Sequence, residues 1–454
     1  MRIHFIAIGG SAMHNLAIAL QLKGYEISGS DDAIYEPSRS RLIKSNLIPV
    51  ELGWDPNKIN NSLDCIILGM HARENNPELL KAQELNIKIY SYPEFLFEQS
   101  RNKTRVVIGG SHGKTTITSM ILHVMRYNNI EIDYMVGGQI EGFENMVHLT
   151  SQNDFILLEG DEYLSSPIDR RPKFHLYKPN IALLSGIAWD HINVFPTYKE
   201  YVEQFKIFLE TIISGGIIVF NEEDDEVAGL VEQTTNQIRK HPYRTHAYKV
   251  ENNITVLDTP EGEMEINLMG AHNMSNLSGA KWICQHMGVD ENDFYEAIAS
   301  FKGAARRLEI ITRSKDVIFY KDFAHSPSKV KATTQAVKNQ FPERKLYAFV
   351  ELHTYSSLSP DFLPQYMETL AVADEAVVFY SPEALAIKKM PPVTAVEIRN
   401  AFGKNDLKVF TDPAEFKKYL WDIEFYNSAI LFMSSGNYGG LDFEELKSLV
   451  PSKF

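Results

Sequence analysis

The sequence predicts an α/β protein of three domains, each built on a mainly parallel sheet. Short apolar, β-branched runs alternate along the chain with stretches of helical periodicity, and this alternation is typical of parallel sheets covered by helices. Glycine-rich turns follow several of the apolar runs, which indicates strand–turn–helix units. The chain has 454 residues. Because that length exceeds what one hydrophobic core supports, we expect about three domains.

The first domain, predicted over residues 1–102, opens with a Rossmann-like βαβ unit. Its elements are, in order, a strand at 3–8, a glycine turn at 9–10, a helix at 12–22 and a strand at 25–31 that ends in Asp31. The dinucleotide motif G-x-G-x-x-G is not satisfied, because Ala7 and Ala12 stand where glycines are required. We therefore expect a single nucleotide phosphate at the helix start, and a dinucleotide site is the alternative.

The second domain, predicted over 103–305, begins with a phosphate-binding loop. Its elements are a strand at 105–108, a glycine-rich turn at 109–113 and a helix that opens near Thr116. Backbone amides at such a helix start point at phosphate oxygens, Lys114 would reach the β- and γ-phosphates, and the Thr115 hydroxyl would hold Mg²⁺. The standard spacing has glycine where this chain has Ile108, so the loop is a variant. An ordinary glycine turn with an exposed lysine is the alternative.

An acidic stretch at 159–162, Glu-Gly-Asp-Glu, follows the strand predicted at 154–158. In a parallel sheet this strand ends at the same edge as the phosphate-binding loop, and carboxylate oxygens there suit Mg²⁺. A solvated acidic turn is the alternative. His191 follows the next predicted strand, at 181–185, and would either contact this edge or be structural. A later acidic run, at 221–225, is expected to be a solvated turn.

Two polar motifs connect the second and third domains. Asn273 and Asn276 precede a predicted helix, where they would either cap it or read a base edge. Arg306 and Arg307 lie near Gly303 and would contact phosphate or ribose, with a surface hinge as the alternative. The third domain, predicted over 306–454, is another Rossmann-like α/β unit. Its strands are predicted at 317–320, 346–350, 375–380 and 429–433.

The composition restricts the class of protein. A net charge of −14 argues against nonspecific binding to nucleic acid or to anionic membrane. The two cysteines, Cys65 and Cys284, lie in apolar surroundings and are expected to be buried thiols of a reducing compartment. Nothing in the sequence resembles a signal peptide, and no apolar run reaches transmembrane length. We expect a cytoplasmic monomer with no nucleic-acid or membrane partner.

These motifs together resemble the Mur ligases, the ATP-dependent amide-forming enzymes of bacterial cell-wall synthesis. The resemblance covers nearly the whole chain, and several ordered motifs are far more specific than any one of them. The motifs are Ile8-Gly9-Gly10 with Met13, Gly29-Ser30-Asp31, Gly110 to Thr116, Glu159 to Glu162, Asp190-His191, Gly270-x-His272-Asn273-x-x-Asn276, Arg306-Arg307-Leu308-Glu309 and Asp322-Phe323-Ala324-His325-x-Pro327.

The resemblance implies that ATP phosphorylates the carboxylate of UDP-N-acetylmuramate and that an amine then attacks the acyl phosphate. The implied UDP-sugar contacts are Gly9, Gly10, Ser11 and Asp31. The implied ATP contacts are Gly110, Ser111, His112, Gly113, Lys114, Thr115 and Thr116, with Asn273 and Asn276 at adenine and Arg306 near the nucleotide. Thr115 and Glu159 would bind one Mg²⁺ and His191 a second. The implied catalytic residues are Lys114, His191, Asp322 and His325.

The incoming amine is either an amino acid or a peptide. The stretch 169–174 is similar to the branch that takes the tripeptide L-alanyl-γ-D-glutamyl-meso-diaminopimelate in peptidoglycan recycling, whereas 351–356 is partly similar to the branch that takes L-alanine. The L-alanine branch usually carries carboxylate-binding arginines where this chain has Thr354 and Ser357. Their absence favours the tripeptide and keeps L-alanine as the alternative.

Two departures from the family pattern suggest other functions. Ser326 stands where a second histidine usually precedes Pro327. Together with the missing arginines, it motivates a catalytically silent sensor of nucleotide or UDP-sugar as an alternative of another class. A kinase is a third possibility, which the N-terminal nucleotide domain disfavours. Lys206 lies near the place of a lysine that is carbamylated in other branches of the family, but the two candidate branches typically lack it.

Overall fold

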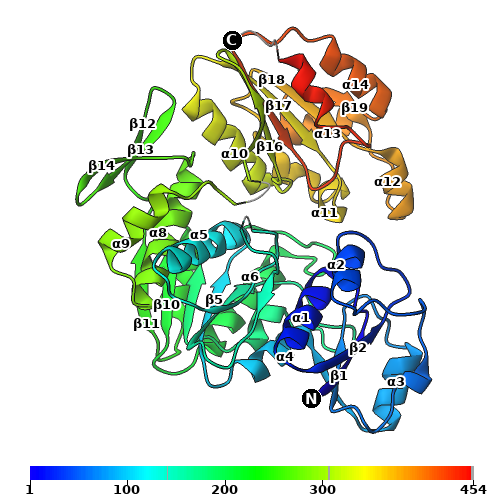
Figure 1. The fold of residues 1–454 in the computed structure, drawn as a ribbon. Coiled ribbons are helices and arrows are strands. Elements are labelled where there is room, and N and C mark those ends of the chain that lie inside the picture. Colours follow the sequence, from blue (N-terminus) through cyan, green and yellow to red (C-terminus); the bar gives the residue numbers. More distant parts are fainter. Residues whose placement is uncertain (141, 305–306, 451–454) are drawn as a thin grey trace. The chain divides into compact units, whose positions relative to one another are not determined.

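The computed structural model describes residues 1–140, 142–304 and 307–450. They form two compact units, each containing two sheets (Figure 1). The first unit combines Met1–Ile187, Val202–Arg244 and Gly279–Ala297, and the second combines Ala188–Tyr201, Thr245–Ser278 and Ile298–Phe454. The predicted mixed α/β class with mainly parallel sheets is confirmed. The domain limits at 102 and 305 stay a prediction.

The first sheet of the first unit is parallel, with the order β2-β1-β3-β4. Its strands are β1 (Arg2–Ile6), β2 (Glu26–Ser30), β3 (Cys65–Leu68) and β4 (Lys88–Ser91), and its helices are α1 (Ser11–Leu22), α2 (Ser38–Lys44), α3 (Pro77–Glu84) and α4 (Tyr92–Gln99). Strand β1 ends at Ile6, earlier than predicted, because Ala7 has a left-handed φ of 71° and takes the chain out of the sheet.

The second sheet of this unit has seven strands in the order β11-β10-β9-β5-β8-β6-β7, of which only β7 is antiparallel to its neighbour. The strands are β5 (Thr104–Gly109), β6 (Asp133–Met135), β7 (Val147–His148), β8 (Phe155–Gly160), β9 (Ile181–Leu184), β10 (Ile217–Asn221) and β11 (Arg239–Tyr243). The helices wholly in this unit are α5 (Lys114–Tyr127) and α7 (Asp225–Gln233). Three further helices have residues in both units: α6 (Tyr198–Thr211), α8 (Ala271–His286) and α9 (Glu291–Ala299).

Two helix starts and one acidic turn differ from the sequence prediction. Helix α5 begins at Lys114, before Thr116, because left-handed Gly113 allows the turn to close earlier. Helix α8 begins at Ala271, so Asn273 and Asn276 lie inside its first turns and do not cap it. The acidic run at 221–225 does more than face solvent, because the Asp224 carboxylate caps α7 and also accepts the backbone amide of Ile187 at 3.0 Å.

The second unit contains a three-stranded antiparallel sheet, β12-β13-β14, and a six-stranded sheet with the order β15-β16-β20-β17-β18-β19. The strands are β12 (Tyr248–Glu251), β13 (Ile254–Thr259), β14 (Gly262–Ile266), β15 (Glu309–Arg313), β16 (Val317–Asp322), β17 (Lys345–Glu351), β18 (Glu375–Phe379), β19 (Lys408–Phe410) and β20 (Ser428–Met433). The helices are α10 (Pro327–Gln340), α11 (Tyr355–Leu358), α12 (Pro382–Ile387), α13 (Ala395–Phe402) and α14 (Pro413–Trp421).

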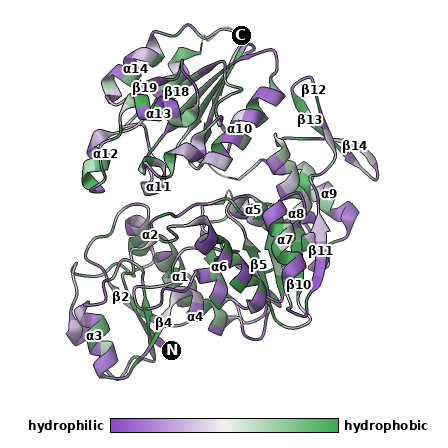
Figure 2. Cartoon of the chain, turned by 180° about the vertical axis from the view of Figure 1, so that it is seen from behind, coloured by the Kyte–Doolittle hydropathy of each residue, from purple (hydrophilic) through white to green (hydrophobic). Residues whose placement is uncertain are grey.

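Successive side chains along the central strands of the six-stranded sheet point to opposite faces, and both faces are buried. Ile318 of β16 packs with Val330 of α10, whereas its neighbour Phe319 packs with Phe416 of α14. Strands β16 to β20 are parallel to one another and β15 is antiparallel to β16. Parallel strands buried on both faces require such continuous apolar sequences. By contrast, β11 is an edge strand of the seven-stranded sheet in the first unit, and Figure 2 shows that it is mainly hydrophilic.

Candidate active site

The phosphate-binding loop lies at the carboxyl edge of the seven-stranded sheet, between β5 and α5. Strands β5 and β8 pair so that Gly109 opposes Gly160, which brings the loop and the acidic stretch to one edge, as predicted. Gly110 has a φ of +128°, and a Cβ atom there would lie 2.2 Å from the Ser185 Oγ. The Ser111 amide donates to the Gly186 carbonyl at 2.9 Å. Glycine is therefore required where the loop crosses the end of β9.

Lys114 is the central cation of this edge. Its ammonium donates to the Gly110 carbonyl at 2.6 Å and to the Glu162 carboxylate at 2.7 Å. Burial alone would lower the pKa of Lys114, but the carboxylates of Glu162, Asp161 and Glu159 outweigh it and raise that pKa. Lys114 is therefore charged at neutral pH, and an anionic ligand at its ammonium would have to replace Glu162 as the partner.

Glu159 and Thr115 fit a divalent cation. The Glu159 Oε2 accepts the Gly137 amide at 2.6 Å, while its buried Oε1 has no hydrogen-bond partner among the described residues. Burial and the charge of Asp161 raise the pKa of Glu159, and the Thr115 hydroxyl partly opposes that rise. An unsatisfied buried carboxylate oxygen beside a hydroxyl is the donor set that Mg²⁺ prefers.

Asp31 lies at the carboxyl end of β2, as predicted, and closes over the glycine turn after β1. Its fully buried carboxylate accepts the Gly9 amide at 2.6 Å and pairs with His71 at 2.9 Å. Burial would raise the pKa of Asp31, but hydrogen bonds from His71 and Gly9 lower it overall. Helix α1 starts beside this carboxylate, with Gly10 as N-cap and Ser11 exposed as first residue. No sequence pattern predicted His71 as a partner of Asp31, because the two residues are 40 positions apart along the chain.

A His71→Gln variant is expected to be less stable than the natural protein mainly at acid pH. The hydrogen bond to Asp31 raises the pKa of His71. The pair therefore stabilises the fold fully between the unfolded aspartate pKa of about 3.9 and the unfolded histidine pKa of about 6.5. This contribution is lost as pH rises through the folded pKa of His71 or falls through the folded pKa of Asp31. After solvent screening we expect a loss of about 0.5–1 kcal/mol near pH 5. Urea unfolding of both proteins between about pH 4 and pH 8 tests this prediction. A difference in free energy of unfolding that does not change with pH would contradict it.

Of the predicted residues that the structure describes, the second unit holds His191, Asn273, Asn276, Asp322 and His325, whereas His112 and Thr116 lie in the first unit. His191 has a φ of 55°, and its amide donates to the Asp190 carboxylate at 2.7 Å. Burial, followed by the charge of Lys329, lowers the pKa of His325 to about 4, so this imidazole is neutral at physiological pH. The His325 Nδ1 contacts the Phe323 carbonyl at 2.8 Å. Asp190, His325 and Lys329 interact electrostatically, which brings the family motifs around 190 and 325 together.

Asp322 has a different environment from the one expected for a group that faces the substrate. Its two carboxylate oxygens accept the amides of Leu308 and Ala324, at 2.8 and 2.7 Å. The carboxylate thus fixes the loop that carries His325. Asn273 and Asn276 are buried on α8, with an Asn276 amide nitrogen 3.4 Å from the Asn273 Oδ1. Arg306 lies outside the described residues.

The segment expected to choose the incoming amine follows β17. Thr354 caps α11 by accepting the Ser357 amide at 3.1 Å, and the two hydroxyls lie 3.0 Å apart. Both hydroxyls are therefore engaged locally. Glu351, which is buried just before them, accepts the Tyr438 amide at 2.9 Å and lies 3.7 Å from the exposed ring of His353.

Comparison with known protein families gives matches along most of the chain. Three family profiles match the chain: the Mur ligase family catalytic domain at residues 2–104, the Mur ligase middle domain at 108–284 and the glutamate ligase domain of Mur ligases at 306–436. The chain belongs to the Mur ligase family. Membership makes it a ligase, and it confirms the multi-domain fold that the motifs implied.

The relatives of this Mur ligase carry the names of two kinds of ligase, which differ in the amine that they join to UDP-N-acetylmuramate. A UDP-N-acetylmuramate–L-alanine ligase of Caldicellulosiruptor bescii is 29% identical over 89% of this chain and 87% of its own. The UDP-N-acetylmuramate–L-alanyl-γ-D-glutamyl-meso-2,6-diaminoheptandioate ligase of Escherichia coli is 28% identical over 97% of this chain and 96% of its own. A murein peptide ligase structure from Psychrobacter arcticus has a TM-score of 0.67, at 22% identity and with 99% and 98% of the two chains covered, and supports the fold.

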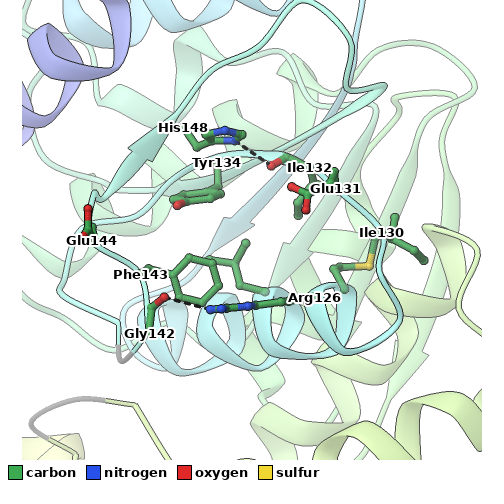
Figure 3. Close-up of a pocket in the computed structure, with 11 residues that line it drawn as sticks. Arg126, Ile130, Glu131, Ile132, Tyr134, Gly142, Phe143, Glu144 and His148 are labelled. Atoms are coloured by element: carbon green, nitrogen blue, oxygen red, sulfur yellow. Dashed lines mark hydrogen bonds between the residues drawn. The ribbon is translucent and has the colours of Figure 1, made fainter. Parts of the chain in front are cut away.

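The Mur ligase chain also has a pocket of about 320 Å³ beside the second half of α5 (Figure 3). Tyr134 lies between His148 and Phe143, and Arg126 covers Phe143 while donating to the Gly142 carbonyl at 2.9 Å. None of the predicted site residues lines this pocket.

Among the described residues, no helix has the length and hydropathy needed to cross a membrane.

Proposed function

We propose that this Mur ligase joins UDP-N-acetylmuramate to the tripeptide L-alanyl-γ-D-glutamyl-meso-diaminopimelate, with ATP and Mg²⁺, in the cytoplasmic recycling of peptidoglycan. The observation that carries the tripeptide is the environment of Thr354 and Ser357. Their hydroxyls bind each other and cap α11. They offer no guanidinium for the single carboxylate of free alanine, whereas a tripeptide has further carboxylates through which it can be held.

The residues at the phosphate-binding loop suit the first chemical step. A carboxylate oxygen of the muramoyl group attacks the γ-phosphorus of ATP, the bond to the β,γ-bridging oxygen breaks, and ADP leaves. Lys114 would stabilise charge on the transferred phosphoryl group, and backbone amides of residues 110–116 would hold the phosphates. Thr115 and Glu159 would hold Mg²⁺, which neutralises the phosphate charge when it is bound.

The second step would use the cluster in the second unit. The neutral amine attacks the acyl carbon and the C–N bond forms. The bond from carbon to the phosphate oxygen breaks, phosphate leaves with the electron pair, and the amine nitrogen gives one proton to water or to a neighbouring base, which leaves the amide. Asp190, His191 and His325 form a cluster that suits the positioning of the amine or the leaving phosphate, and Asp322 would position His325. Asn273 and Asn276 would contact adenine, and Gly9, Gly10, Ser11 and Asp31 would hold the UDP group.

Phosphate release and product mass, measured with UDP-N-acetylmuramate, MgATP and one amine at a time, test the proposal. We expect turnover with the tripeptide to exceed that with L-alanine by about 10²-fold or more. Turnover with L-alanine alone would establish the other ligase, whose name the Caldicellulosiruptor relative carries. Binding of both nucleotides without release for any amine would favour a sensor. Omission of UDP-N-acetylmuramate controls for simple ATP hydrolysis.

A further inference from the structure

A second lysine, Lys173, faces the acidic stretch beside the phosphate-binding loop. Its ammonium lies 3.2 Å from the Asp161 carboxylate and 5.3 Å from the centroid of the Tyr92 ring on α4. The backbone fixes both groups, because the Lys173 amide donates to the Tyr163 carbonyl and the Phe174 amide donates to the Asp161 carbonyl. The side chain is only 16% exposed. An ammonium so enclosed is held by its carboxylate and its aromatic neighbour.

Three carboxylates and two lysines share this region. Glu162 is the ion-pair partner of Lys114, and Asp161 is the ion-pair partner of Lys173. Asp161 also attracts Lys114, because its charge is among those that raise the pKa of that lysine. The two ion pairs therefore divide the carboxylates between the lysines, and Lys114 directly bonds only one of them.

This division determines how easily Lys114 can bind a nucleotide. To reach a phosphate, the Lys114 ammonium must leave Glu162, and any second carboxylate that attracts it makes this exchange less favourable. We infer that Lys173 is a positioning residue that occupies Asp161 and so leaves Lys114 available for the phosphates of ATP. This inference rests on the proposed ATP-dependent function and adds a residue that the predicted ATP contacts do not include.

Equilibrium binding of MgATP to the full chain tests the role of Lys173. Lys173→Met keeps the length of the side chain but removes its charge, so Asp161 would compete for Lys114. We expect MgATP affinity to fall about tenfold, with UDP-N-acetylmuramate affinity unchanged. Lys173→Arg should keep affinity within about threefold of the natural protein, because the charge is retained. Lys173→Met combined with Asp161→Asn should recover most of the loss, because the unbalanced carboxylate is gone.

Lys178→Met is a matched control, because Lys178 also lies over an aromatic ring, that of Phe97 at 5.3 Å, on the same segment. It should leave MgATP affinity unchanged. The inference is overturned if Lys173→Met binds MgATP normally, if it weakens both ligands equally, or if the double variant shows no recovery. Should Lys173→Met fail to fold, the double variant and Lys173→Arg still decide between these outcomes. Because binding is read without turnover, failure here differs from failure of every amine to support phosphate release.

Discussion

Lys114→Ala is expected to reduce kcat/KM by about 10³-fold or more, because the cation that neutralises the transferred phosphoryl group is lost. Affinity for UDP-N-acetylmuramate should stay nearly unchanged, since the Gly9–Asp31 site is built from β1 and β2 and shares no hydrogen bond with Lys114. Phosphate release measures the first effect and equilibrium binding of the UDP-sugar the second. Loss of UDP-sugar binding would contradict the separation of the two nucleotide sites.

The same substitution removes the lysine that forms an ion pair with the buried Glu162. We expect a stability loss of about 2–4 kcal/mol because this buried ion pair is broken from one side. Lys114→Ala combined with Glu162→Gln should recover most of that stability but no turnover, which separates folding from catalysis. Lys81→Ala is a suitable control, because Lys81 also pairs with a glutamate, Glu84 at 2.9 Å, but on the surface. It should change neither stability nor turnover measurably.

Glu159→Gln is expected to reduce kcat/KM by about 10²–10³-fold and to raise the Mg²⁺ concentration needed for half-maximal rate about tenfold or more. Glutamine keeps an oxygen that can accept the Gly137 amide, so the loop after β6 should retain its position. The change removes the charge on the buried oxygen that lacks a partner. The rate measured against Mg²⁺ concentration shows whether Glu159 acts by binding the metal or by holding the loop after β6.

Glu131→Gln provides the comparison for Glu159→Gln, because Glu131 is an exposed acid of the same unit and should tolerate the change without effect. A lower rate with an unchanged Mg²⁺ requirement would indicate that Glu159 acts through the loop rather than through a metal.

The local pattern of the chain predicted the strand–loop–helix unit around Lys114 and the delivery of Glu159 to the same sheet edge. Both depend on hydrophobic periodicity and on strand direction, which a sequence displays directly. The partners of these groups were not predicted. Lys114 bonds Glu162, 48 residues away, and Asp31 bonds His71, 40 residues away. Such pairs arise from tertiary packing, and no spacing rule specifies them.

The start of α8 shows a second limit of sequence patterns. Asn side chains favour helix caps because they compete for backbone amides, so a cap was a reasonable expectation for Asn273 and Asn276. The helix instead begins before both, and it buries them. The folded chain shows that the two Asn side chains lie inside the helix. Their amide groups therefore need hydrogen-bond partners other than the free backbone amides at the helix N-terminus.

The second compact unit draws its residues from three separate parts of the chain, and this has a consequence for dissecting the protein. Trp189, Ile192 and Met269 pack against the same core as Ile318 and Val330 of the C-terminal sheet. A fragment that starts at residue 306 would lack these side chains and would expose the apolar surface they cover. Exchange of amine specificity between relatives therefore requires the segments 188–201 and 245–278 to be transplanted together with the C-terminal sheet.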